Sequence, residues 1–130
     1  MTIEQTPFDE RDAIPLHRRR KGSTELAMAT FASPLYRIVD GVYLSHGTTN
    51  AHLVTTADGD VVISTGLAVE GPIHRAKFDE ASRAPVKRII LTQAHLDIVG
   101  GTNAFKGPES EVIAHRASPA CQADDVRIQA

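Results

Sequence analysis

The stretch that decides the fold of this chain reads Thr92-Gln93-Ala94-His95-Leu96-Asp97-Ile98-Val99-Gly100-Gly101. It follows residues 86–91, the most apolar and β-prone run of the sequence, so we expect a strand to end where this polar loop begins. His95 and Asp97 are two positions apart and would project from the same face of an extended segment. An imidazole and a carboxylate that converge in this way can supply part of a metal site, although two ligands alone do not make one.

This stretch resembles the strand-end signature of the metallo-β-lactamase-fold hydrolases, Thr-His-x-His-x-Asp-His followed by Gly-Gly. Gln93 stands where the first His of the signature belongs, and Ile98 stands where the last belongs. Some relatives use Gln at the first position, whereas Ile98 offers no lone pair and is expected to pack in the core. The remaining signature positions match, at Thr92, His95, Asp97, Gly100 and Gly101.

The resemblance continues in the family's order and spacing over residues 36–116. Residues 41–44 and 50–54 look like the opening hairpin of the family, and residues 59–66 look like its Gly-x-x-x-x-Ile-Asp-Thr-Gly turn, with Ser64 in place of Asp. The resemblance implies an α/β (α+β) fold, namely the N-terminal half of a metallo-β-lactamase-like αββα sandwich with a mixed sheet and flanking helices.

Local patterns predict the element order ββββ-αβαβα. The turn signal Asp40-Gly41 joins the first two strands. Pro72 starts a helix over residues 73–83, with Ile73, Ala76 and either Glu80 or Ala81 on its inner side. The strand at 86–91 is expected to be buried on both faces. The other predicted elements are strands at 35–39, 42–45, 52–56, 60–64 and 111–114, and helices at 99–105 and 119–128.

The length of 130 residues suits one domain, which we expect at 35–130 behind an irregular N-terminal arm at 1–34. A short helical turn is predicted at 25–31. The basic cluster at 17–21 lies among acidic residues without an aromatic platform, so it is interpreted as a solvated arm, or one that packs on a partner subunit.

Bulk properties argue against several functional classes. The formal net charge of -2 gives no general attraction to nucleic acid or to an anionic membrane. No apolar run approaches the roughly 20 residues of a membrane span. The acidic N-terminus is unlike a secretory signal, and the single Cys121 agrees with a reducing compartment, so a cytoplasmic location is predicted.

In the resembling family, two zinc ions lie between the strand-end motif and loops from the second half of the chain. The resemblance therefore implies Gln93, His95 and Asp97 as metal ligands here, with Asp97 also catalytic because it orients the attacking water. We expect either one zinc ion, shared with a partner chain, or no zinc ion. His115 follows a strand and is interpreted as structural or solvated. We interpret His46, His52 and His74 as residues that pack on the surface or in the core. We interpret Asp124 and Asp125 as charged residues on the surface of a helix.

The family's domain is considerably longer than this chain, which corresponds to about its first half. The sheet of such a half would leave one apolar face exposed. This is far more exposed apolar surface than a monomer tolerates. We therefore expect a partner, either a second polypeptide that carries the C-terminal half of the fold or a copy of this chain.

Three functions stay open at this point. The leading hypothesis is a subunit of a split metal-dependent hydrolase. The variants at Ser64 and Gln93 look like the alkylsulfatase-like branch, which would make the substrate an ester or sulfate ester. The competing hypothesis is a non-catalytic structural or regulatory subunit that keeps a degenerate motif and stabilises a complete paralogous chain. Ile98 favours this second interpretation, and His95 with Asp97 favours the first. A truncated, inactive fragment is the third.

Overall fold

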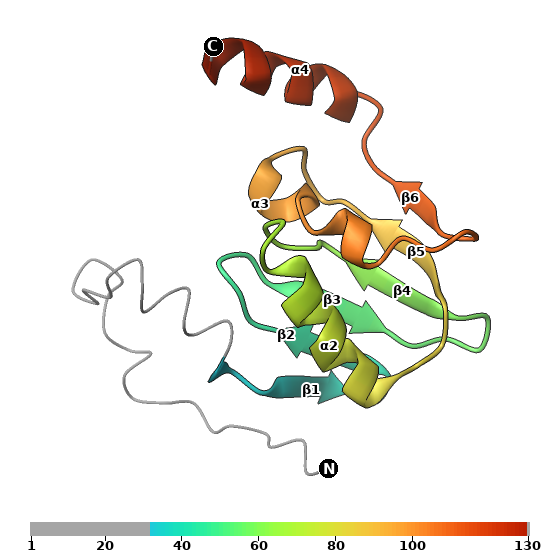
Figure 1. The fold of residues 1–130 in the computed structure, drawn as a ribbon. Coiled ribbons are helices and arrows are strands. Elements are labelled where there is room, and N and C mark those ends of the chain that lie inside the picture. The colour runs from blue at the N-terminus through green and yellow to red at the C-terminus, as the bar shows by residue number, and fades with distance from the viewer. Residues whose placement is uncertain (1–31, 130) are drawn as a thin grey trace.

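The computed structural model describes residues 32–129, in which six strands form one mixed sheet (Figure 1). The strands lie side by side in chain order, the first four antiparallel and the last two pairings parallel. They are β1 (Leu35–Val39), β2 (Val42–Ser45), β3 (Ala51–Val54), β4 (Asp60–Ile63), β5 (Val86–Ile90) and β6 (Glu111–Ile113). The helices are α2 (Gly71–Ala81), α3 (Leu96–Val99), the 3-10 helix η3 (Thr102–Ala104) and α4 (Ser118–Gln129). This confirms the predicted mixed sheet with flanking helices.

The first hairpin forms as its turn signal predicts. Gly41 has a φ of 76°, a left-handed conformation that a glycine adopts without a steric penalty, and Val39 pairs with Val42 across the turn. The amide of Thr55 donates to the carbonyl of Gly41 at 2.8 Å and joins β3 to the same turn. Local turn chemistry therefore sets the register of the antiparallel half of the sheet.

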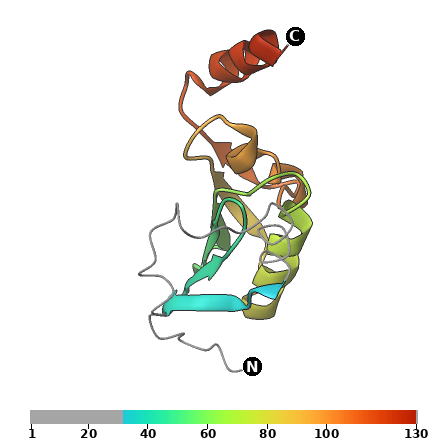
Figure 2. The same cartoon turned by 90° about the vertical axis from the view of Figure 1, so that its left-hand side faces the viewer.

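Helix α2 covers one face of the sheet, as the edge-on view in Figure 2 shows. Leu53, Val62 and Ile89 are fully buried beneath it, and Phe78 of α2 packs with Phe105 in the same core. The predicted inner face of α2 was only partly right: Ala81 packs against the core, whereas Ala76 and Glu80 are exposed and Ile73 is only half-buried. Its buried residues are Gly71, His74, Lys77 and Phe78. The error arose because two of these side chains are polar, so an apolar pattern does not reveal them.

The opposite face of the sheet is not covered by any element of residues 32–129. A row of side chains that pair across neighbouring strands runs along this face, and most of them are half-buried: Tyr36, Leu44, His52, Ile63 and Ile90, with the more exposed Ile113 at the end. The prediction that β5 is buried on both faces was therefore wrong. Ile89 is fully buried, but its neighbour Ile90 lies on the open face.

Helix formation after β5 also differs from the expectation. The predicted helix at 99–105 is replaced by α3, which begins inside the motif at Leu96, and by η3. The chain turns between these two helices at Gly100 and Gly101, which pack directly against the backbone of the loop between β4 and α2, at residues 65–68. Asp97 thus lies in the first turn of a helix, so the same-face argument for His95 and Asp97 does not hold.

Two expectations concern residues that lie outside the described part of the chain, namely the basic cluster at 17–21 and the helical turn at 25–31. Within residues 32–129, no helix has the length and apolar character needed to cross a membrane.

Candidate functional site

The motif lies at the carboxyl ends of the parallel strands, which is where open α/β sheets usually bind ligands. Three segments meet there: the motif at residues 92–101, the loop at 64–70 that follows β4, and the loop at 46–50 between β2 and β3. Each segment is joined to another by hydrogen bonds, and these bonds decide where the motif side chains lie.

The β4–α2 loop holds the backbone of the motif. Thr65 donates to the carbonyl of Ile98 twice, from its amide at 2.9 Å and from its Oγ1 at 2.7 Å. Ser64 occupies the position of the Asp in the resembling turn, and its hydroxyl lies 3.1 Å from the hydroxyl of Thr92. Ser64 also has a φ of 59°, an uncommon conformation for a residue other than glycine. Such local strain persists only where the surrounding contacts enforce it.

Asp97 is oriented by the β2–β3 loop. Its Oδ2 accepts a hydrogen bond of 3.0 Å from Thr49 Oγ1, and its side chain is half-buried. The loop is held in turn by buried Glu70, whose two carboxylate oxygens accept from the amides of Thr48 at 2.6 Å and Leu67 at 3.1 Å. The acidic side chain of Asp97 is therefore fixed through contacts that come from far along the chain.

A buried histidine lies beneath the same loop. His74 is fully buried, and its Nδ1 is 2.7 Å from Ser45 Oγ. The pKa of His74 is lowered to about 4, mainly by burial; the carboxylate of Glu70 opposes the shift, and the nearby charge of Lys77 adds a smaller contribution in the same direction as burial. His74 is neutral at physiological pH and supports the loop from below. The sequence left surface and core packing open for His74, and the structure places it in the core.

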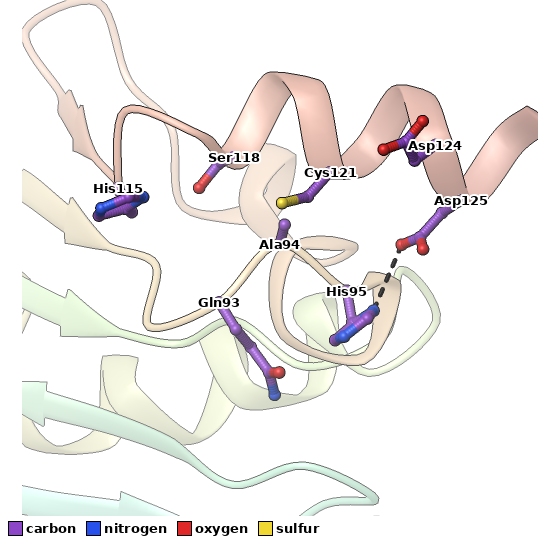
Figure 3. Close-up of a pocket in the computed structure, with 8 residues that line it drawn as sticks. All are labelled: Gln93, Ala94, His95, His115, Ser118, Cys121, Asp124 and Asp125. Carbon is purple, nitrogen blue, oxygen red and sulfur yellow. Dashed lines mark hydrogen bonds and ion pairs between the residues drawn. The ribbon is translucent and has the colours of Figure 1, made fainter.

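His95 is directed toward α4. Its side chain is 63% exposed, and its Nδ1 lies 3.3 Å from Oδ2 of Asp125 (Figure 3). The neighbouring Asp124 pairs instead with Arg127 on the helix surface, as expected. Asp125 is thus a site residue that the sequence interpretation missed, because nothing in the local pattern distinguishes it from Asp124.

A cavity of about 430 Å³ separates the motif from α4. Gln93, His95, His115 and Cys121 line it together with Asp125 (Figure 3). The structure therefore brings His115 to the same cavity as His95. Asp97 does not line it and faces the β2–β3 loop instead.

The donors of the motif fit zinc by type but not by number. Imidazole and carboxylate are ordinary zinc ligands, and His95 and Asp97 supply one of each. No cluster of three or more His, Cys, Asp and Glu side chains that could hold a metal ion is found among residues 32–129. Ile98 is only 5% exposed, in keeping with its predicted place in the core. These residues can therefore supply only part of a coordination shell.

The family model described as the metallo-beta-lactamase superfamily matches residues 44–123, which is more than half of the sequence. The chain belongs to this superfamily, whose hydrolase-like fold includes lactamases and sulfatases. No curated protein gives a significant match.

Three solved structures show the likeness in detail. A Cronobacter sakazakii metallo-β-lactamase with a HARLDQ motif is 28% identical, with a TM-score of 0.60 over 68% of this chain and 36% of that one. The GOB-18 metallo-β-lactamase of Elizabethkingia meningoseptica is 28% identical, with a TM-score of 0.56 over 64% of this chain and 32% of that one. The sec-alkylsulfatase Pisa1 of Pseudomonas sp. is 16% identical, which shows the fold alone, with a TM-score of 0.64 over 71% of this chain and 16% of that one.

The chain spans about a third of the length of the two lactamases. The motif HARLDQ and the letters of residues 93–98 here, QAHLDI, agree at Ala, Leu and Asp. Both differ from the His-x-His-x-Asp-His signature at its last position, and each has one further difference, at the first position here and at the third in HARLDQ.

Proposed function

We propose that this chain is one half of a split metallo-β-lactamase-fold hydrolase, and that a second polypeptide supplies the other half by packing on the open face of the sheet. The observation that carries the proposal is the difference between the two faces. On one face Leu53, Val62 and Ile89 are fully buried under α2, whereas the mostly apolar row from Tyr36 to Ile90 on the other face is only half-buried. Covering apolar surface contributes about 25 cal/mol per Å², so this row is a strong driving force for association.

In the assembled domain, Gln93, His95 and Asp97 would hold a zinc ion together with donors from the partner chain. A bound zinc ion would supply Lewis acidity at this edge of the sheet. Asp97, which Thr49 holds in place, would orient the attacking water. The variants at Ser64 and Gln93, which look like the alkylsulfatase-like branch, favour an ester or sulfate ester as the substrate.

The chain in isolation is expected to associate through its open face. Sedimentation of the wild-type chain should show a dimer or larger species, because unpaired strand edges and exposed apolar surface both promote association. Replacing Leu44 by Glu places a charge within the row, between Tyr36 and His52, and should shift the population toward monomer. Val69→Glu makes the same type of change at a side chain that is 75% exposed in the β4–α2 loop, and it should leave the distribution unchanged. A sharp wild-type monomer of 14.0 kDa that unfolds cooperatively would contradict the proposal.

Zinc content and hydrolysis test the catalytic part of the proposal on the co-purified complex. His95→Ala should remove most of the zinc and most of the hydrolysis of a nitrophenyl ester or sulfate, because it deletes the imidazole donor. Asp58→Ala is the control: it removes an exposed carboxylate in the β3–β4 turn, at the opposite end of the sheet. Elemental analysis measures the zinc.

A second candidate function is a non-catalytic subunit that stabilises a complete paralogous chain. The burial of Ile98 favours it, because a buried apolar side chain occupies the position of a metal-binding His in the resembling signature. An intact complex whose zinc and activity do not change in His95→Ala would support this second function and exclude the first.

A further inference from the structure

We propose that this chain binds a small organic anion with an apolar body in a cavity between α2 and the loop that precedes β6. The cavity lies at the amino end of β5, where Val86 lines it, whereas the motif follows the carboxyl end of the same strand. The proposal therefore concerns the other end of the sheet and does not depend on the proposed function.

The size and the inner wall of the cavity suit an apolar ligand. Its volume is about 350 Å³, toward the lower end of the roughly 300–1,000 Å³ of ligand pockets in proteins. Val86 and Phe105 line it and are only 8% and 2% exposed, because both belong to the hydrophobic core. Pro85, Ala104 and Pro108 add further apolar surface. A ligand that covers these side chains removes apolar surface from water, which favours binding.

The outer wall is the loop at residues 106–110, which hydrogen bonds hold in place. Ser110 Oγ donates to the carbonyl of Val86 at 2.6 Å and accepts from the amide of Gly107 at 2.8 Å. The amide of Ser110 donates to the carbonyl of Gly107 at 3.1 Å, which closes the turn. The cavity is therefore formed before a ligand arrives, and a preformed site loses less conformational freedom on binding.

Charge decides the chemical class of the ligand. Three charged side chains line the cavity, namely Arg75, Lys106 and Glu109. Glu109 forms an ion pair with Lys87, and Nε of Arg75 donates to Asp79 at 2.9 Å. Within residues 32–129, the ammonium group of Lys106 has no ion pair or hydrogen bond. An acidic group of the ligand can therefore pair with Lys106, beside the guanidinium of Arg75.

Two fluorinated probes of nearly equal size test the charge and the apolar body separately. They are para-fluorobenzoate, which is an anion, and para-fluorobenzyl alcohol, which is neutral. Fluorine NMR relaxation of the probes measures the affinity of the full chain for each, whatever its state of association. The benzoate should bind at least about fivefold more tightly than the alcohol, the ratio expected of one ion pair near the surface. Equal affinities, or no binding of the benzoate, would overturn the proposal.

Variants of the chain locate the binding of the benzoate. Lys106→Gln should weaken this binding by about fivefold and leave that of the alcohol unchanged. Arg116→Gln is the matched control, because it removes a cation that is also exposed but does not line the cavity. An unchanged benzoate affinity in Lys106→Gln would contradict the proposal. An equal loss in Arg116→Gln would show a general effect of net charge and would also contradict it.

A third variant tests the cavity itself. Ala104→Leu adds a larger side chain to the lining and should weaken the binding of both probes, with circular dichroism to check that the fold is kept. Full affinity for the benzoate in a folded Ala104→Leu chain would place the probe elsewhere and overturn the inference. Lys106 and Arg116 are exposed, so the two charge variants decide the question even if Ala104→Leu does not fold.

Discussion

Replacing Gly101 by alanine is expected to lower the free energy of unfolding by about 3 kcal/mol, the upper part of the usual range for overpacked sites. An added Cβ would lie 2.1 Å from the carbonyl oxygen of Thr65 and 2.8 Å from the Cα of Gly71. Both are backbone atoms, so no side-chain rotation can relieve the clash. The φ of Gly101 is -81°, which any residue can adopt, so the requirement is for space alone.

The clash should also displace the motif, because Thr65 holds it through two hydrogen bonds to Ile98. Urea unfolding at one protein concentration measures the effect, since association shifts apparent stability. Gly107→Ala is the matched control: its Cβ would have 3.6 Å to its nearest neighbour, Ser110 Oγ, and should cost little. Equal midpoints for Gly101→Ala and Gly107→Ala would show that the close approach of the two loops is not required.

Lowering the pH from 7 to 4 is expected to destabilise the fold by up to about 3 kcal/mol through His74 alone. Burial lowers the pKa of His74 in the folded state to about 4, against an ordinary value of 6.5. Above pH 6.5 the ring is neutral in both states, so its contribution to stability is fully present. As the pH falls from 6.5 to 4, the unfolded chain takes up a proton that the folded chain does not, and stability is lost across that window.

Two other groups modify this acid response. Burial also lowers the pKa of His52, with a smaller contribution from His46, which adds to the loss in the same direction. Burial raises the pKa of Asp60, so the folded state binds a proton there more readily than the unfolded state. The contribution of Asp60 to stability therefore becomes more favourable as the pH falls toward 3.8, the ordinary pKa of this carboxyl group. This gain partly offsets the stability that the two histidines lose.

Variants at His74 separate its contribution from the rest. His74→Gln should be less stable than wild type at pH 8, because it disrupts the contact with Ser45, but its stability should depend less on pH between 6.5 and 4. The exposed His115, changed to Gln, should keep the wild-type pH dependence. Urea midpoints measured across this range test both expectations, and an unaltered slope in His74→Gln would assign the acid sensitivity to other groups.

Features that depend on neighbouring residues in the sequence were predictable. The Asp40-Gly41 turn, the helix start at Pro72 and the strand before the motif all appear in the structure within about two residues of their expected positions. The order of these segments was also enough to identify the superfamily and the mixed sheet. Turn conformation, proline geometry and strand propensity act over a few residues, so they can be inferred from the sequence without knowledge of the tertiary contacts.

The placement of the motif side chains could not be predicted in this way. The sequence identified His95 and Asp97 as candidates, but only the tertiary structure directs Asp97 to Thr49 and His95 to Asp125. These partners lie 48 positions from Asp97 and 30 positions from His95 in the chain. Which residue of α4 meets His95 depends on the side of this helix that faces the motif. The burial of His74 on the inner face of α2 was missed for the same reason, because it depends on Ser45, which lies 29 positions away on strand β2. Such contacts are set by how the loops and helices pack, which the local sequence does not determine.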